Sequence, residues 1–339
     1  MASMYGMRRI SWRLISLVLI ASLCCVSLGF LVPANAQEDS KRVVIYSGAE
    51  EYRNAYFSKR LAEQFPDYEI VIDYMPTGNM AAKLQAEGTQ TECDIAFDVD
   101  YGYISLLEPI FADVSQYDQS VFMEDTRSKN GKYLPETRNG GAIIVNLDVL
   151  AEKNLKEPSN YTDLLDAQYN GLISMPNPKS SGTGYMFLKS LVNAWGEEAA
   201  FEYFDGLAEN ILQFTSSGSG PVNALVQGEV AVGLGMTAQA VTQLNNGVNL
   251  KILYFEEGSP SSLYGYAMIE GKQNKPAVRE VFDFFYTTLV DEDKALYYPE
   301  QIYTDKVFEV ENYPQNIPYA NMENNTTEEK LRLLDLWEH

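Results

Sequence analysis

Short apolar runs alternate with helix-like segments along most of this chain, and that alternation limits the fold more than any other feature. An apolar run at 43–46 predicts a strand, and the next segment carries an apolar residue at every fourth position from Phe57 to Phe65, which predicts a helix. Further strands are predicted at 70–72 and 95–97. Strand, helix, strand, helix, strand is typical of a parallel, doubly wound α/β sheet that binds ligands at the carboxyl ends of its strands.

The same alternation starts again in the middle of the chain. Strand-like runs at 172–175, 211–214 and 230–234 are each followed by a helix-like segment. A capping box formed by Thr326 and Glu329 predicts one last helix near the end. Because 339 residues exceed one ordinary hydrophobic core, we expect two doubly wound α/β lobes.

Two further segments indicate how these lobes are joined. The runs at 140–146 and 264–269 have the pattern of crossovers between the two series. We therefore expect lobe 1 to comprise 37–140 and 267–339, and lobe 2 to comprise 141–266. Two crossovers form a hinge, and a hinge between two α/β lobes creates a cleft that can close on a ligand.

The first 36 residues have the features of an export signal. Three arginines precede an apolar stretch over 15–32, and Ala34-Asn35-Ala36 has the small-x-small form that signal peptidase cleaves. We therefore expect cleavage after Ala36 and a mature chain in the periplasm. Because the apolar stretch approaches the roughly 20 residues needed to span a bilayer, an uncleaved N-terminal membrane anchor is the alternative.

The charge of the chain excludes two classes of partner. The sequence has 25 Lys and Arg residues against 47 Asp and Glu residues, a formal net charge of −22. Such a chain has no general attraction for nucleic acid phosphates or for anionic membrane surfaces. We therefore expect neither nucleic acid binding nor strong binding to a membrane surface, and the acidic surface is sufficiently explained by solubility.

Histidine and cysteine are almost absent from the mature chain. His339 is the only histidine, and Cys93 is the only cysteine after the predicted cleavage site. The mature chain therefore lacks the residues needed for catalysis by Ser-His-Asp or Cys-His groups, and for metal binding by several histidines. Cys93 adjoins a strand-like run and is expected to be buried. The sequence predicts no enzyme active site and no cofactor.

Two serine- and glycine-rich segments, 180–185 and 215–221, each follow a strand-like run and begin a helix-like one. The first turn of a helix leaves backbone N–H groups unpaired and carries partial positive charge, so small residues there let a polar or anionic group approach closely. The alternative is that these serines and threonines only cap their helices. Two such segments at similar places in consecutive units favour a ligand site.

Several short motifs, in order and spacing, resemble the extracellular solute-binding proteins of bacterial ABC importers. The resemblance is to the group labelled iron(III)-type, which also includes proteins that bind sugar phosphates or phosphonates. The motifs lie at 44–47, 76–78, 94–97, 158–165, 178–183 and 228–233. The resemblance implies a type 2 periplasmic binding protein fold and no catalysis. It also implies delivery of a small ligand to a membrane permease that a cytoplasmic ATPase drives.

The resemblance also implies which residues surround the ligand. From lobe 1 they are Ser47, Gly48, Ala49, Thr77, Gly78, Asn79 and Asp98. From lobe 2 they are Ser181, Gly182, Thr183, Ser217, Gly218, Ser219 and Thr237. Because these positions offer hydroxyls and backbone N–H groups, we predict an oxyanion-bearing ligand, a sugar phosphate or a phosphonate. Arg138, near the first crossover, is a possible partner for the anion, and Tyr264 is a further cleft candidate.

A ferric ion is the alternative ligand. Iron-binding members carry adjacent tyrosines after the Gly-Glu-x-Ala-x-Gly strand, where this chain has Met236-Thr237-Ala238. Tyr297-Tyr298 lies far downstream and is interpreted as packing. Glu50, Asp98 and Asp100 could form a carboxylate site for iron, or they could be solvated acids that complement helix dipoles.

A use outside transport also stays open. The same fold could serve as an exported ligand sensor or as an adaptor that presents its ligand to a membrane receptor. The sequence by itself does not distinguish this use from import.

Overall fold

The computed structural model describes residues 40–339, and Arg42–His339 form one compact unit. The predicted signal peptide and its cleavage site at Ala36 lie outside the described residues. Among the helices of residues 40–339, none is long and apolar enough to cross a bilayer. Cys93 is buried, as predicted.

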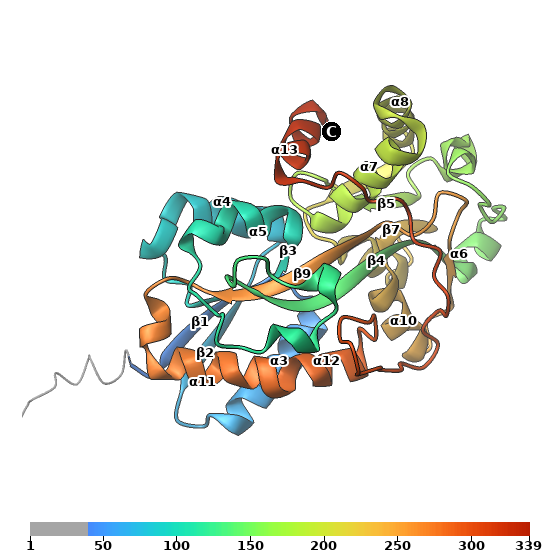
Figure 1. The fold of residues 1–339 in the computed structure, drawn as a ribbon. Coiled ribbons are helices and arrows are strands. Elements are labelled where there is room, and N and C mark those ends of the chain that lie inside the picture. Colours follow the sequence, from blue (N-terminus) through green and yellow to red (C-terminus); the bar gives the residue numbers. More distant parts are fainter. Residues whose placement is uncertain (1–39) are drawn as a thin grey trace, which may run out of the picture. The chain divides into compact units, whose positions relative to one another are not determined.

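A mixed sheet of nine strands runs through the compact unit, in the order β2-β1-β3-β9-β4-β7-β5-β6, with β8 paired to β4 (Figure 1). The strands β2-β1-β3 and β7-β5-β6 are parallel groups, and β9 and β4 join them in antiparallel fashion. The strands are β1 Arg42–Ser47, β2 Glu69–Tyr74, β3 Ile95–Asp100, β4 Leu134–Asn146, β5 Ile173–Pro176, β6 Ile211–Thr215, β7 Val232–Met236, β8 Leu250–Leu253 and β9 Ser261–Met268. All the strands that the apolar runs predicted are present, although parallel pairing is confined to these two groups.

The helices occupy the segments between these strands and the end of the chain. They are α3 Glu51–Gln64, α4 Thr77–Glu87, α5 Tyr101–Leu107, α6 Leu147–Glu152, α7 Gly182–Trp195, α8 Glu197–Ala208, α9 Gly220–Val226, α10 Thr237–Asn245, α11 Pro276–Phe284, α12 Val290–Leu296 and α13 Thr327–Leu336. The helices that follow the two serine- and glycine-rich segments are α7 and α9, as predicted.

The half of the unit built on β1, β2 and β3 is layered as the alternation predicts. Side chains of a strand point to opposite faces in turn. Val43 and Ile45 accordingly pack with α3 and α11, whereas Val44 and Tyr46 pack with α4 and α5. Figure 1 shows α4 and α5 on one side of these strands and α3 and α11 on the other. The carboxyl ends of the three strands therefore meet at one edge between two helical layers.

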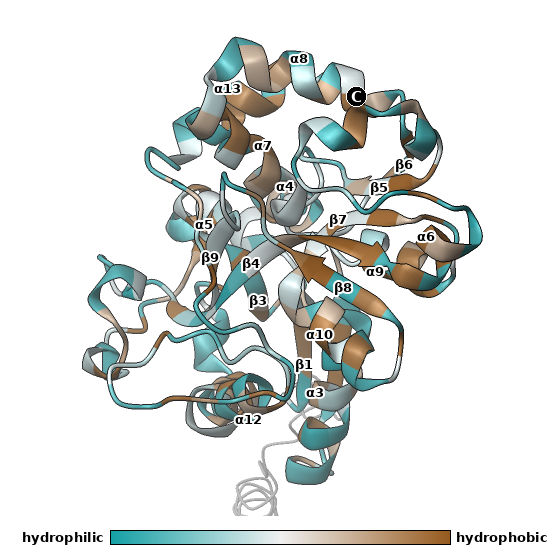
Figure 2. Ribbon diagram, turned by 90° about the vertical axis from the view of Figure 1, so that its right-hand side faces the viewer, coloured by the Kyte–Doolittle hydropathy of each residue, from teal (hydrophilic) through white to brown (hydrophobic). Residues whose placement is uncertain are grey.

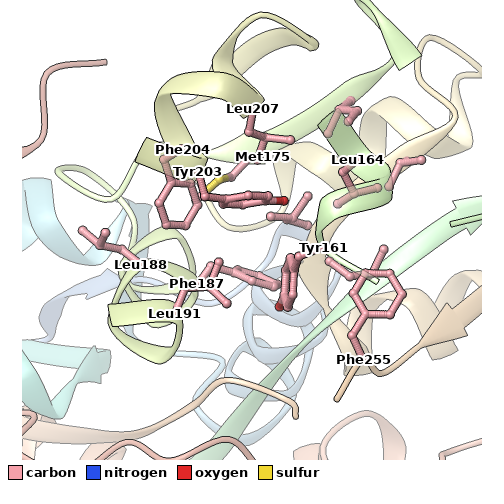
Figure 3. Packing of buried hydrophobic residues seen from close by; sticks show 14 of the residues in the cluster. Tyr161, Leu164, Met175, Phe187, Leu188, Leu191, Tyr203, Phe204, Leu207 and Phe255 are labelled. Carbon is pink, nitrogen blue, oxygen red and sulfur yellow. The ribbon is translucent and has the colours of Figure 1, made fainter. Parts of the chain in front are cut away.

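The other half repeats this arrangement around β4, β5 and β7. Ile143 and Val145 pack with α7 and α8, while Ala142 and Ile144 pack with α9 and α10. In the first of these clusters Tyr161 makes edge contacts with Tyr203 and Phe255, at centroid distances of 5.9 and 5.1 Å (Figure 3). In Figure 2 most of β8 and the adjoining end of β4 are hydrophobic, whereas the end of β4 beside β9 is hydrophilic.

The long strand β4 passes from one half to the other. It pairs with β9 from Leu134 to Gly140 and with β7 from Gly141 to Val145, so the change of partner falls where the first crossover was predicted. β9 already pairs with β4 at Ser261. The division of the chain into lobes at 140 and 266 remains a prediction, and this pairing favours a return near 260.

Helix α13 touches both halves. Thr326 caps it by accepting a hydrogen bond from the amide of Glu329, as the capping box predicts. Leu333 and Trp337 pack in the cluster formed with α7 and α8. Thr327 donates to the carbonyl of Gly102 in α5 of the other half. The last helix therefore contacts both halves, whereas the predicted division, which remains a prediction, assigns it to lobe 1.

Candidate functional site

A cavity of about 30 Å³ lies between the two halves at the carboxyl ends of several strands. On the β1–β3 side it is lined by Gly48, Glu50, Tyr74, Pro76, Thr77 and Asp98. On the opposite side it is lined by Ser181, Gly182, Thr183, Gly218, Ser219 and Met236. Asn139 of β4 and Tyr264 of β9 complete it from the two connecting strands. The cavity thus lies at the carboxyl ends of strands, where the strand and helix alternation predicted that ligands bind.

Five helices begin at this cavity. Their N-cap residues, which all line it, are Glu50 for α3, Pro76 for α4, Ser181 for α7, Ser219 for α9 and Met236 for α10. The first turn of each helix has backbone N–H groups without intrahelical partners, and its dipole places partial positive charge there. The helix starts therefore offer hydrogen-bond donors and partial positive charge to the cavity, beside the carboxylates of Glu50 and Asp98.

Small residues let the two halves approach closely here. A Cβ atom on Gly182 would lie 2.5 Å from the Tyr264 hydroxyl, and one on Gly78 would lie 2.8 Å from the carbonyl oxygen of Lys179. The amide of Gly78 donates a hydrogen bond to the carbonyl of Ser180 across the cleft, at 3.2 Å. Glycine at 78 and 182 is thus a steric requirement of the closed cleft.

A buried arginine organises the acidic wall of the cavity. Arg53 in α3 is 1% exposed. Its guanidinium donates to Asp293 at 2.9 and 2.6 Å, to Glu50 at 3.1 Å and to Asp98 at 3.2 Å. It also donates to Glu136 at 2.5 Å. These bonds hold Glu50 and Asp98 in fixed positions at the cavity.

Asp98 is placed by an irregularity in β3. The register against β9 shifts between Ala96 and Val99, and Asp98 has a φ of 57°, in the left-handed region that few residues other than glycine, asparagine and aspartate adopt. Burial raises the pKa of its carboxyl to about 6, and the nearby Arg53 charge opposes that shift. Strained backbone and a raised carboxyl pKa are both typical of functional positions.

The structure brings together eight of the fourteen residues predicted to surround the ligand. These are Gly48, Thr77, Asp98, Ser181, Gly182, Thr183, Gly218 and Ser219. Of the others, Ala49 is buried, Asn79 is exposed, and Gly78 bonds across the cleft. The hydroxyls of Ser47 and Thr237 are hydrogen-bonded with Asn54 and Tyr254. Ser217 lines a neighbouring, larger cavity instead.

Sequence reasoning missed Tyr74, Pro76, Asn139 and Met236. Tyr74 and Met236 are the last residues of β2 and β7, so the rule that ligands bind at carboxyl ends of strands would have found them. Asn139 had no local signal, because it lies within a strand and reaches the cavity only through the path of β4 between the halves.

The interpretation of Glu50, Asp98 and Asp100 as solvated acids is wrong, since all three are buried. The Oδ1 atom of Asp100 accepts hydrogen bonds from the ammonium of Lys330 at 2.8 Å and from the amide of Gly102 at 2.7 Å. Residues 40–339 contain no group of three or more His, Cys, Asp or Glu residues that could hold a metal ion.

Arg138 and the pair Tyr297-Tyr298, which the sequence also singled out, have partners in the structure. Arg138 is paired with Asp125 at 2.7 Å and does not line the cavity, so it is not placed to hold an anion there. Tyr298 is fully buried and donates to Glu50 at 2.6 Å, and Tyr297 packs against the ring of Tyr52. The tyrosine pair thus packs, as interpreted, but one of its members also fixes a cavity residue.

Residues 98–321 match the family model described as bacterial extracellular solute-binding protein. The chain belongs to that family. The predicted resemblance is therefore confirmed, and the role of this solute-binding protein of the ABC importer type is to bind a small solute for a membrane permease. An uncharacterized protein of Haemophilus influenzae is 28% identical over 270 residues, which cover 77% of this chain and 76% of that one.

Solved structures show the same fold at lower identity. The periplasmic binding protein AfuA from Actinobacillus pleuropneumoniae, with fructose-6-phosphate bound, superposes with a TM-score of 0.75 at 22% identity, covering 87% of this chain and 97% of that one. Iron-bound HitA from Pseudomonas aeruginosa gives a TM-score of 0.69 at 16% identity, covering 87% and 98%. These likenesses establish the two-lobed type 2 periplasmic binding protein fold.

Proposed function

We propose that this solute-binding protein captures a phosphorylated sugar or polyol in the cavity between its lobes. It delivers that solute to a permease driven by a cytoplasmic ATPase, and it carries out no reaction on it. The observation that carries the proposal is the convergence of five helix N-termini on one cavity.

The anionic group of the solute binds at the start of α7. Ser181, Gly182 and Thr183 supply two hydroxyls and first-turn amides there, and Thr77 faces them from the start of α4. Among the described residues that line the cavity, none is a lysine or an arginine. An oxyanion is therefore held by neutral donors and helix dipoles, which is a common way to bind phosphate.

The opposite end of the cavity selects hydrogen-bond donors. Asp98 and Glu50 present carboxylates, and the Oδ1 atom of Asn139 is buried without a partner in the described part of the chain. A buried acceptor without a donor costs about 1–3 kcal/mol, so a solute that brings donors is favoured. The hydroxyls of a sugar phosphate or the amine of an aminophosphonate bring several such donors, whereas inorganic phosphate brings only its P–OH groups.

Entry of such a solute requires the halves to separate. The halves touch across the cleft, where the amide of Gly78 donates to the carbonyl of Ser180 at 3.2 Å. The strands β4 and β9, which connect the halves, are the natural hinge, and Gly140 and Gly141 mark the change of partner in β4. We infer that the lobes open about these strands and close on the solute.

Two observations bear on the choice between phosphate and iron. AfuA has fructose-6-phosphate bound and HitA has iron bound, so fold likeness supports both kinds of ligand. In this chain, however, Arg53 already bonds Glu50 and Asp98, which reduces their negative charge toward a ferric ion. Iron is therefore the second candidate.

The test is thermal unfolding of the protein, stripped of bound solute, against a panel of compounds. The panel contains glucose 6-phosphate, fructose 6-phosphate, aminoethylphosphonate, inorganic phosphate and ferric ion. A compound at about 100 times its Kd adds roughly 2.7 kcal/mol to the free energy of unfolding, which raises Tm by a few degrees. We expect the sugar phosphates to raise Tm. A rise with ferric ion alone would establish the iron alternative instead.

A matched pair of variants locates the anion site. Ser181→Ala combined with Thr183→Val removes two hydroxyls that line the cavity, whereas Ser180→Ala removes a neighbouring hydroxyl that does not line it. Isothermal titration with glucose 6-phosphate should show at least tenfold weaker binding for the first and an unchanged Kd for the second. Equal affinities for both would contradict the site.

The compartment is the periplasm in this proposal, because the family is extracellular and the leader has a cleavage motif. The mass of the mature protein decides the point. Cleavage after Ala36 gives a chain that begins at Gln37, whereas a membrane-anchored protein retains the full leader. A permease and an ATPase encoded beside the protein would support import, and a neighbouring sensor kinase would support the receptor use.

A further inference from the structure

A second, larger cavity adjoins the first. It measures about 930 Å³ and lies between α3 and β2 on one side and α9 and α10 on the other. Glu50, Tyr74 and Ser219 line both cavities, so the two spaces share a wall and form an inner and an outer compartment of one cleft. The inner compartment, at about 30 Å³, is much the smaller of the two, and the outer one has room for a larger group.

Gln239, which lines the outer compartment, has a buried hydrogen-bond acceptor without a partner among the described residues. The residue is 2% exposed, and its amide nitrogen donates to the side chain of Asn223 at 3.0 Å and to the carbonyl of Ser219 at 3.3 Å. Because a carbonyl oxygen can only accept, these bonds fix the orientation of the amide. Its Oε1 atom remains a buried acceptor without a partner in residues 40–339. A bound group that carries a hydroxyl would supply the missing donor.

Two tyrosines also line the outer compartment. Tyr52 in the first turn of α3 and Tyr74 at the end of β2 both line the outer compartment, and Tyr74 is 46% exposed. Ligand sites typically combine such aromatic surfaces with a few fixed polar groups. Tyr74 lines both compartments, so its side chain lies at the boundary between them.

The start of α7, where the phosphate is proposed to bind, does not line the outer compartment, so a second anion is not favoured there. Glu50 and Glu51 are its only charged lining residues in the described part of the chain, and both are acidic. Asn54, Ser58, Asn223 and Gln243 add neutral polar groups. A neutral, hydroxyl-rich group matches this lining.

We infer that the outer compartment binds a neutral, polyhydroxylated extension of the phosphorylated solute, so that the preferred solute is a glycosylated sugar phosphate of disaccharide size. The inference rests on the proposed function, because it assumes a phosphate held in the inner compartment at the start of α7. It assigns the predicted ligand residue Ser217 to the extension rather than to the phosphate.

Isothermal titration with three probes tests the inference: glycerol 3-phosphate, glucose 6-phosphate and trehalose 6-phosphate. In the unaltered protein we expect trehalose 6-phosphate to bind at least tenfold more tightly than glucose 6-phosphate. The quantity to follow in variants is the ratio of these two Kd values, because a general loss of stability affects both alike.

Two variants act on the outer compartment by different means. Gln239→Leu removes the buried acceptor, and Ala55→Trp fills the space from an exposed position of α3. Both should bring the ratio close to one. Gln227→Leu is the control, because Gln227 is exposed just beyond the end of α9 and does not line the cavity, and it should retain the full ratio.

The possible failures are distinguishable. If sugar phosphates bind but trehalose 6-phosphate binds no more tightly than glucose 6-phosphate, the outer compartment has no role and the proposed function stands. A tenfold preference that both variants leave intact likewise refutes the assignment to this compartment. If none of the three probes binds, the proposed function itself fails.

Discussion

At the scale of single residues, the cleft depends on how Arg53 balances buried acids. Four carboxylates surround it, and its guanidinium also lies 4.5 Å from the centre of the Tyr298 ring. Lys294 beside them is fully buried, and burial lowers its pKa to about 8. Several charged groups are thus buried together. Removing one of them leaves the charge of another buried without an opposite charge beside it.

Replacing Arg53 should therefore destabilise the protein strongly. Breaking a buried ion pair typically costs about 3–5 kcal/mol because a charge is left buried and unpaired. We expect Arg53→Met to lower the free energy of unfolding at pH 7 by at least about 3 kcal/mol in urea denaturation. Arg60→Met is the control on the same helix. Its ion pairs are partly exposed and screened by solvent, so its loss of stability should be much smaller.

Asp98 should make stability depend on pH. Its pKa is raised by burial to about 6 in the folded protein, above its value of about 3.9 in an unfolded chain. A group with a raised folded pKa favours folding in its protonated form, so its contribution is complete below about pH 4 and is lost as pH rises through 6. Relative to Asp98→Asn, the unaltered protein should thus lose stability between pH 4 and 6.

Urea denaturation across this pH range checks the sign, with Asp113→Asn as the opposite case. Hydrogen bonds from Ser115 lower the pKa of Asp113, so its contribution is present above its unfolded pKa and is lost as pH falls. An increase in the stability of the unaltered protein over Asp98→Asn from pH 4 to 6 would refute the prediction for Asp98.

At the scale of elements, α13 fastens the two halves together. Lys330 is fully buried, and its ammonium bonds Asp100 from the β1–β3 half at 2.8 Å. The same ammonium lies 3.6 Å from the ring centre of Tyr103 and 4.5 Å from that of Tyr185 in α7 of the other half. One cation therefore contacts side chains of both halves, outside the cavity.

A double-mutant cycle measures this contact. Lys330→Met alone should cost about 3–5 kcal/mol, because Asp100 is left as an uncompensated buried charge. Combining it with Asp100→Asn removes that charge while keeping an acceptor for the amide of Gly102, so the double variant should regain a large part of the loss. Additive losses in chemical denaturation would mean that the two residues do not act as a pair.

At the scale of the whole molecule, the structure is a closed arrangement in which the halves touch directly. The hydrogen bond from Gly78 to Ser180 and the contacts of α13 both span the cleft. The proposed function has the first of these contacts open when the solute enters. Opening and closing about β4 and β9 is therefore part of the proposed function.

Small-angle X-ray scattering should detect this motion. The radius of gyration of the stripped protein is expected to fall when glucose 6-phosphate is added, because the solute holds the lobes together. The variant with Ser181→Ala and Thr183→Val serves as the control and should show no decrease at the same concentration. A constant radius for the unaltered protein under saturating solute would contradict closure.

The sequence alone determined the parts of this protein that depend on local pattern. The period of the apolar residues predicted the strands and helices, and the serine- and glycine-rich segments at 180–185 and 215–221 predicted two of the helix starts that line the cavity. Short motifs in order predicted the family. Each of these signals lies within a few consecutive residues, so it can be recognised in a single sequence.

Only the tertiary structure decided which side chains meet. Arg53 joins acids from positions 50, 98, 136 and 293, Asn139 reaches the cavity through the path of β4, and α13 crosses to the far half. No local pattern marks such contacts, because they arise from chain segments far apart in sequence. The buried state of Glu50, Asp98 and Asp100 was missed for the same reason: burial of a charge depends on a partner that the fold supplies.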